Sequence, residues 1–319
     1  MLNKGISINR VNVLVIGDIM LDHYIYGDCN RISPEAPVQV VEVKREEYTL
    51  GGAGNVLKNL RAFNAEATII SVVGADQNAH VINEHLAKTG ITHYGVVKDE
   101  QRCTTIKSRV LAARHQLVRL DREIIEPIND EIVSQMMSLI NNDIKKYDIV
   151  LLSDYNKGVL SINFLKQIFE VCRAAGVKTV IDPKGNDFSK YKGANIIKPN
   201  KKEATIASGI IIKDQASIEE ACVKLKEITG CDEIVITMSE DGIASYTNGQ
   251  LTIVPTKALD VVDVTGAGDT VLASLGVALA SGNSLALACD FANHAAAVVV
   301  SKVGSSTATL AEINEKFGN

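Results

Sequence analysis

One stretch organises this sequence: Asp263-Val264-Thr265-Gly266-Ala267-Gly268-Asp269. It follows an apolar segment that contains Val261 and Val262, and it precedes a long alanine-rich apolar segment at 271–280. This order predicts a strand, a tight glycine turn and a helix. A helix start carries unpaired N–H groups and a partial positive charge, so it attracts anions, and glycines let that backbone approach a ligand closely.

Asp269 is expected in the first turn of this helix, beside the amides of Gly266, Ala267 and Gly268. An anion site with a carboxylate at its edge suits phosphoryl transfer to a hydroxyl group. The amides stabilise the developing negative charge, and the carboxylate accepts the hydroxyl proton. An acidic residue that only stabilises the helix dipole fits the spacing equally well.

The composition is that of an ordinary globular protein and excludes several classes of function. The chain has 319 residues, 46% of them hydrophobic and 22% charged, and its net charge of −5 argues against broad electrostatic binding of nucleic acid. The six cysteines form no Cys-x-x-Cys pair, which argues against a zinc ribbon or a redox dithiol. Residues 1–10 lack an apolar signal core, and no apolar run has membrane-spanning length, so we expect a cytoplasmic protein.

Apolar, β-branched runs alternate with amphipathic stretches along most of the chain. Buried strands are predicted at 11–16, 67–73, 149–152, 179–181, 195–197 and 233–237. Helices are predicted at 55–63, 130–144, 162–175 and 218–229. The alternation predicts an α/β fold with a mostly parallel sheet covered by helices on both faces, and ligands bind such sheets at the carboxyl ends of the strands.

Two β-rich segments interrupt this alternation. Residues 38–43 have strand character, and residues 104–120 combine it with Arg109, Arg114 and Arg119. We expect them to form a small antiparallel flap. Its exposed face could be a lid over substrate, a dimer surface, or both.

Two early motifs suit a polyhydroxy ligand. Gly51-Gly52-Ala53-Gly54-Asn55 precedes a helix but is no dinucleotide fingerprint, because Leu57 stands at the third glycine position; a P-loop is absent. Its small residues would let Asn55 meet sugar hydroxyls, although a simple helix-entry loop looks the same. Asp18 and Asp22 follow the first strand and could accept hydrogen bonds from hydroxyls, but acids in loops are usually just solvated.

Later motifs point to phosphate and metal chemistry, each beside a simpler alternative. Asn200 and Glu203 are spaced to hold magnesium through its water shell, yet the spacing alone favours a helix-capping box. The turn at 237–242 could border a nucleotide or be a plain turn. Lys157 and Lys184 each lie just past a strand, where they could meet a phosphate or remain solvated.

Together these motifs resemble the ribokinase-like (phosphofructokinase-B type) carbohydrate kinases. The loop at 51–55, Asn200-x-x-Glu203 and Gly266-Ala267-Gly268-Asp269 occur in the order typical of that family, and the resemblance covers nearly the whole chain. It implies a single ribokinase-like kinase domain over residues 1–319, with β lid segments around 23–48 and 102–120.

Within the family the chain is most similar to the kinases that act on D-glycero-D-manno-heptose 7-phosphate. This similarity lies in the short sequence motifs at 17–22, 31–38, 119–121 and 153–158. Many such relatives carry a second, nucleotidyltransferase domain, and we expect that activity to be absent here.

The resemblance implies that ATP phosphorylates O1 of the heptose 7-phosphate, giving the 1,7-bisphosphate for ADP-heptose and lipopolysaccharide core synthesis. The alternatives are another sugar or sugar-phosphate kinase acting on fructose phosphates or ribose, a nucleoside kinase, and a non-catalytic sugar sensor. Asp269 would be the general base, and the amides of Gly266, Ala267 and Gly268 the anion hole.

The resemblance also assigns the remaining site residues. ATP and Mg²⁺ would be bound by Asn200, Lys201, Lys202, Glu203, Thr237, Ser239, Gly242 and Asn293. The sugar would be held by Asp18, Asp22, Gly51, Gly52 and Asn55, and its phosphate by Arg119, Lys157 and Lys184. Asp263 would lie at a site for a monovalent cation such as K⁺. The strand character of the flap segments also makes a homodimer through the flap possible.

Two positions depart from the family pattern. Val264 replaces the threonine common within the late signature, and Ser239 stands where many members have glycine. We expect the first to matter little, because valine fits a strand end. The second bears on the contacts to adenine.

Overall fold

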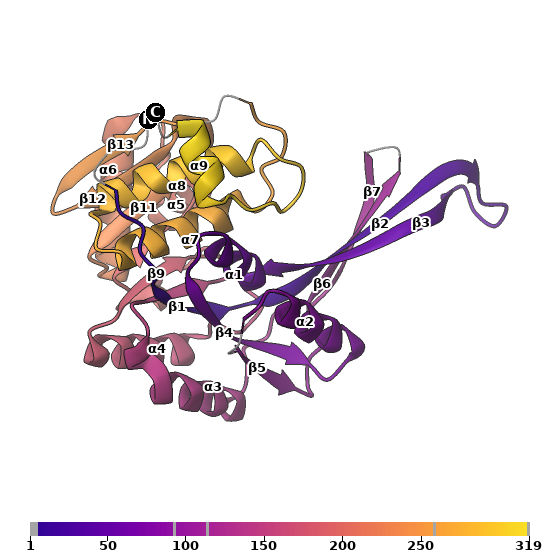
Figure 1. The fold of residues 1–319 in the computed structure, drawn as a ribbon, viewed down its shortest axis with the longest axis horizontal. Coiled ribbons are helices and arrows are strands. Elements are labelled where there is room, and N and C mark those ends of the chain that lie inside the picture. The colour runs from indigo at the N-terminus through magenta and orange to yellow at the C-terminus, as the bar shows by residue number, and fades with distance from the viewer. Residues whose placement is uncertain (1–5, 92–93, 113–114, 258–259, 318–319) are drawn as a thin grey trace.

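The computed structural model describes residues 6–91, 94–112, 115–257 and 260–317. Within these ranges the named strands form a nine-stranded main sheet and a four-stranded flap that extends away from it (Figure 1). Helices cover both faces of the main sheet, as the sequence predicts. None of the helices in the described part of the chain is long and apolar enough to cross a bilayer.

The main sheet is parallel except at one edge. In spatial order its strands are β13 (Gln250–Val254), β12 (Ile243–Thr247), β11 (Glu233–Thr237), β10 (Ile196–Ile197), β9 (Lys178–Asp182), β8 (Ile149–Ser153), β1 (Asn12–Gly17), β4 (Glu66–Gly74) and β5 (Tyr94–Asp99). Only β12 and β13 run antiparallel to their neighbours. The seven parallel strands therefore end at one edge, which is where the sequence places the ligand-binding motifs.

Side chains alternate between two hydrophobic cores along each strand. In β1, Val13 and Val15 point into one core, and Leu14 and Ile16 into the other. The first core packs against α1 (Ala53–Ala62), α2 (Gln77–Lys88), α7 (Ala267–Ala280), α8 (Leu285–Val299) and α9 (Leu310–Phe317). The second packs against α3 (Asp130–Asp143), α4 (Ile162–Ala175), α5 (Lys201–Ser208) and α6 (Gln215–Thr229). Three short 3₁₀ turns are η1 (Ile144–Lys146), η2 (Ser189–Tyr191) and η3 (Ser239–Asp241).

The flap is a mixed sheet, and the antiparallel arrangement expected from the sequence is therefore partly wrong. Its order is β3 (Gln39–Gly52), β2 (Ile19–Ile32), β6 (Ile106–Ala112) and β7 (His115–Arg122). The β2–β6 pair is parallel because α1, β4, α2 and β5 intervene, so the chain re-enters the flap in its original direction. Arg114 lies outside the described residues.

The strand expected before the glycine turn is also absent from the described residues at 260–265. Val261, Val262 and Val264 are largely exposed, and the amides of Val262 and Asp263 donate to the carbonyl of Val300. This segment finds its backbone partner at the end of α8, so it never joins the sheet. The expectation that Val264 occupies a strand end is therefore wrong. A helix does follow the glycine turn with Asp269 in its first turn, as predicted, and it begins at Ala267.

Asp18 and Asp22 are likewise not loop acids in solvent. Residues 19–22 belong to β2, and both carboxylates are buried. Because only Asp18 separates the end of β1 from the start of β2, the chain passes directly from the main sheet into the flap. The two acids consequently lie at the junction between sheet and flap.

Candidate active site

The start of α7 has the geometry that the glycine motif predicts. Gly266 is its N-cap with φ +79°, and a Cβ added there would lie 2.7 Å from Nδ2 of Asn55. The first helical hydrogen bond runs from the amide of Thr270 to the carbonyl of Gly266, and the amide of Ala267 donates to Val264. The Ala267 amide, expected from the sequence to belong to the anion hole, is thus already bonded, which corrects that expectation. The amides of Gly268 and Asp269 precede the first helical bond and are the N–H groups left for an anion.

Asp269 lies in the first turn of α7, and both of its oxygens are held. Asn55 Nδ2 donates to Oδ2 at 2.8 Å, and the Tyr155 hydroxyl donates to Oδ1 at 2.7 Å. Burial raises the pKa of Asp269, while these two donors and Lys198 act in the opposite direction. The carboxylate is therefore fixed in orientation by α1 and by the loop after β8.

Asp269 borders a cavity of about 170 Å³ at the carboxyl ends of β8, β9 and β10. Six residues assigned from the sequence line it with Asp269: Lys184, Asn200, Glu203, Thr237, Gly266 and Gly268. Four polar residues of the lining were not assigned from the sequence: Asp154, Tyr155, Asp182 and Lys198. The structure thus joins the late signature to the Asn-x-x-Glu motif in one site.

Buried Lys198 and partly exposed Asp182 form an ion pair in this cavity. Only 2% of Lys198 is exposed, and its Nζ lies 2.9 Å from Oδ1 of Asp182. Burial raises the pKa of Asp182 to about 7, although Lys198 works against that rise. A Cβ added at Gly268 would lie 3.9 Å from the Lys198 Nζ, so the ammonium faces the open start of α7. Asp182 is the last residue of β9, and Lys198 follows the adjacent parallel strand β10. Because ligands bind such sheets at the carboxyl ends of the strands, the sequence pattern could have indicated both residues.

The Asn200–Glu203 spacing does form a capping box. The Glu203 amide donates to Asn200 Oδ1 at 2.9 Å, and the Asn200 amide donates to Glu203 Oε2 at 3.0 Å. Glu203 Oε1 also accepts a hydrogen bond from Lys184 Nζ at 2.6 Å. The motif is therefore a helix-capping box, and its two residues also line the cavity. Across the described residues, no three His, Cys, Asp or Glu side chains cluster closely enough to hold a bare metal ion.

The other residues assigned to the nucleotide do not line this cavity. Lys201 forms an ion pair with Asp241 at 3.1 Å, and Lys202 is exposed. Asn293 is buried, and its amide nitrogen donates to the carbonyls of Val254 and Pro255 just after β13. Asn293 therefore holds the chain that follows the last strand.

Ser239 and Gly242 form the turn after β11, and both have positive φ, +53° and +92°. A left-handed residue with a Cβ is strained by roughly 1–2 kcal/mol, while glycine costs about 0.5–1 kcal/mol of chain entropy. We therefore expect Ser239→Gly to raise the free energy of unfolding by about 0.5–1 kcal/mol, measured by urea denaturation. Ser134→Gly within α3 is the control and should be destabilising by about 0.5–1 kcal/mol. Destabilisation by Ser239→Gly would show that the turn is not strained.

A larger cavity, of about 1050 Å³, lies on the other side of the glycine turn, beneath the flap. Tyr24, Tyr26, Arg109 and Leu111 line it from the flap, and Asp263, Thr265, Gly304 and Ser305 from the main domain. Arg109 Nη1 donates to Asp22 Oδ1 at 2.6 Å, and its guanidinium lies 5.3 Å from the Tyr24 ring centre. The flap and the segment that precedes α7 therefore enclose one cleft.

The glycines assigned to sugar binding lie where β3 enters α1. A Cβ at Gly51 would collide with the Asp22 carboxylate, and Gly52 has φ +58° with no room beside the Asp18 carbonyl. Their small size brings β3 against the start of β2. This contact places Asn55 beside Asp269.

Asp18 and Asp263 use their carboxylates to hold loops of the site. Asp18 accepts hydrogen bonds from the amides of Tyr155, Lys157 and Val159 at 2.8, 3.2 and 3.3 Å. Burial, and then the nearby Asp154, raise the pKa of Asp18 to about 6. Asp263 accepts from the amides of Thr265 and Gly304, both at 2.9 Å. Burial opposes these bonds, yet they lower the pKa of Asp263.

The three cations assigned to the acceptor phosphate are not brought together. Lys184 lies in the Asp269 cavity with Glu203. Lys157 pairs with Glu123 at 2.7 Å, and Arg119 on β7 pairs with Asp121 at 2.9 Å. Lys107 contacts both of these acids, so Lys157 and Arg119 belong to one network at the base of the flap.

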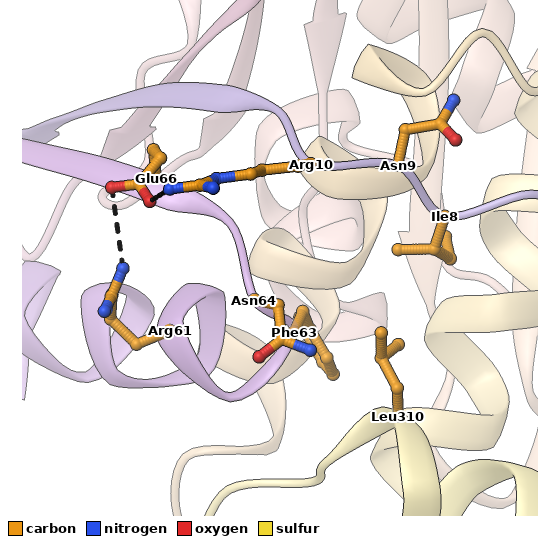
Figure 2. A pocket seen from close by; sticks show the side chains of 8 residues that line it. All are labelled: Ile8, Asn9, Arg10, Arg61, Phe63, Asn64, Glu66 and Leu310. Carbon is orange, nitrogen blue, oxygen red and sulfur yellow. Dashed lines mark hydrogen bonds and ion pairs between the residues drawn. The ribbon is translucent and has the colours of Figure 1, made fainter.

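A separate surface cavity, of about 370 Å³, lies near the amino ends of β1 and β4 (Figure 2). Its polar lining is dominated by Glu66, which pairs with Arg10 and Arg61. Phe63 and Leu310 supply apolar surface. It lies at the strand ends opposite to Asp269 and has no carboxylate beside an anion site, so the Asp269 cleft is the candidate active site.

The sequence profile described as "pfkB family carbohydrate kinase" matches residues 11–312. The protein named bifunctional protein HldE of a Nitratiruptor species is 50% identical over 307 residues, which are 96% of this chain and 65% of that protein. The protein of the same name from Desulfatibacillum aliphaticivorans is 47% identical over 306 residues, 96% of this chain and 63% of that protein. The chain thus spans less than two thirds of the length of these relatives.

Solved structures share the fold. The Arabidopsis thaliana ribokinase complexed with ribose and ATP superposes with a TM-score of 0.75 at 20% identity, covering 97% of this chain and 99% of that one. Escherichia coli phosphofructokinase-2 in complex with potassium gives a TM-score of 0.78 at 17% identity, covering 98% and 99%. The ribokinase-like architecture expected from the motifs is thereby confirmed.

Proposed function

This chain belongs to the pfkB family of carbohydrate kinases, and we propose that it transfers the terminal phosphoryl group of ATP to O1 of D-glycero-D-manno-heptose 7-phosphate. The supporting observation is the buried Asp269 at the open start of α7, with one cavity on each side of the glycine turn. The shared name of the 45–50% identical relatives supports placement in one subgroup of the family.

The smaller cavity is the proposed site of the ATP phosphates. Gly268, Asp269 and Lys198 line it, so their amides and ammonium would stabilise negative charge that develops during transfer. Asn200 and Glu203 fit a magnesium ion through its water shell, because both oxygens of Glu203 are already bonded within the protein. That ion would neutralise charge on the phosphates.

The larger cleft beneath the flap is the proposed site of the sugar. Arg109 lines this cleft and holds Asp22 beside it, so the pair would offer a donor and an acceptor for hydroxyl groups. Asn55 Oδ1 is buried without a hydrogen-bond partner among the described residues, which leaves an acceptor beside Asp269. Asp269 would remove the O1 proton as the phosphoryl group arrives. An anomeric hydroxyl is more acidic than an ordinary alcohol, so a carboxylate suffices as base.

The acceptor's own phosphate requires cations on the sugar side. Lys157 and Arg119, joined through Lys107 at the base of the flap, are the proposed candidates, and neither of them lines the larger cavity itself. Lys184 lines the ATP cavity, and we propose that it contacts the donor phosphates. The loop that Asp263 organises with Gly304 is the proposed K⁺ site.

We further propose a cytoplasmic homodimer that contributes to lipopolysaccharide core synthesis. β7 presents Leu117, Val118 and Leu120 largely exposed on the flap. An apolar flap surface of this kind suits a second copy of the chain.

A panel of acceptors tests the function. Purified protein is assayed for ADP release with heptose 7-phosphate, fructose 6-phosphate, ribose and adenosine, and ³¹P NMR identifies the phosphorylated position. We expect the highest kcat/KM with heptose 7-phosphate and a new anomeric phosphate signal. A preference for another acceptor would show that the proposed substrate is wrong. Sugar binding without ADP release would support a non-catalytic sugar sensor.

A further inference from the structure

We propose that Tyr155 is a positioning residue whose hydroxyl, together with Asn55, fixes the orientation of the Asp269 carboxylate toward the acceptor hydroxyl. This inference rests on the proposed kinase function. The two donors contact different oxygens of Asp269, at 2.7 Å from Tyr155 and 2.8 Å from Asn55. A carboxylate bonded through both oxygens cannot rotate about its χ2 angle without breaking one of these bonds.

The loop that carries Tyr155 is itself fixed. Asp18 accepts hydrogen bonds from three of its amides, including that of Tyr155 at 2.8 Å. Gly158 has φ +87°, and any Cβ there would collide with the Glu126 carbonyl. Arg102 donates to the carbonyls of Lys157 and Glu126 at 3.1 and 2.9 Å. The position of Tyr155 is therefore set by the main domain, and a chain of contacts links Asp18 to Asp269.

The chemistry of the phenol suits this role. Burial and then the neighbouring carboxylate of Asp269 raise the pKa of Tyr155, so the hydroxyl stays protonated and remains a donor. A hydrogen bond to the charged form of an acid favours that form. Tyr155 thereby helps to keep buried Asp269 ionised, and so able to accept a proton, while Asp269 does the chemistry.

Tyr155→Phe removes the hydroxyl and keeps the ring. We expect kcat to fall by about 10- to 100-fold, because a hydrogen bond to a charged group is lost. The pKa of Asp269 should rise once a donor to its charged form is gone. The acidic limb of the pH profile of kcat/KM should therefore move to higher pH. The KM for ATP should change much less than kcat.

Tyr246→Phe is the matched control. Tyr246 is a buried tyrosine on β12 that packs in the second core, away from the Asp269 cavity, so its profile should equal that of the unmodified protein. If Tyr155 served only as packing, Tyr155→Phe would also keep the unmodified profile, and the proposal would be overturned.

A measurement without turnover separates this inference from the kinase proposal. The Asp269 carboxyl carbon is titrated by ¹³C NMR, with its signal assigned by its loss in Asp269→Asn. A higher titration midpoint in Tyr155→Phe supports the positioning role even if none of the acceptors is phosphorylated. An unchanged midpoint refutes it even if the unmodified protein is an active kinase.

Discussion

Asp269→Asn is expected to lower kcat by about 100- to 10,000-fold, the usual contribution of a general base. Asparagine has the shape of aspartate, and its carbonyl can still accept from Asn55 while its amide donates to the Tyr155 oxygen. Without a basic carboxylate, the acceptor proton has no place to go in the transition state. The loss should appear in kcat, with the Kd for ATP nearly unchanged, because Asp269 acts on the acceptor hydroxyl.

The measurements are steady-state ADP release and ATP binding by calorimetry. Asp214→Asn is the control, because Asp214 caps α6 and asparagine caps helices equally well. That variant should match the unmodified protein in kcat and in stability. Near-normal turnover by Asp269→Asn would remove Asp269 from the mechanism.

Lys198→Met is expected to lower kcat by about 100- to 1,000-fold, as loss of one fixed donor to a developing oxyanion does. The side chain keeps its length but loses the ammonium that faces the start of α7. It also leaves Asp182, whose side chain is 19% exposed, without its cation. Breaking a fully buried pair costs about 3–5 kcal/mol, so we expect a smaller loss of stability here. The pKa of Asp182, already raised to about 7, should rise further, so this carboxyl becomes neutral at physiological pH.

The double variant Asp182→Asn/Lys198→Met separates the two effects. It removes the unpaired acid, so the free energy of unfolding measured in urea should recover in part while kcat stays low. Recovery of kcat in the double variant would mean that Lys198 only neutralises Asp182. Lys178→Met is the control, since Lys178 is exposed at the opposite end of β9 and should leave both quantities unchanged.

Long periodic elements could be predicted from the sequence because their side-chain pattern is local. α4 at Ile162–Ala175 and β11 at Glu233–Thr237 have the predicted bounds. The apolar pattern at 261–264 led to a wrong prediction of a strand. The pattern does not reveal that the amides of Val262 and Asp263 donate to the carbonyl of Val300. The direction of β6 was also hidden, since it depends on a crossing through the main sheet.

Three features of the late glycine motif are determined by the sequence alone: the helix start, its left-handed glycine and the carboxylate in its first turn. These depend on backbone preferences within a few residues. Only the tertiary structure decided which groups hold that carboxylate, because Asn55 and Tyr155 are 214 and 114 residues away from Asp269 along the chain. It likewise decided that Lys198 and Asp182 pair in the same cavity. Such contacts follow from the order and register of parallel strands, which bring distant strand ends to one edge of the sheet.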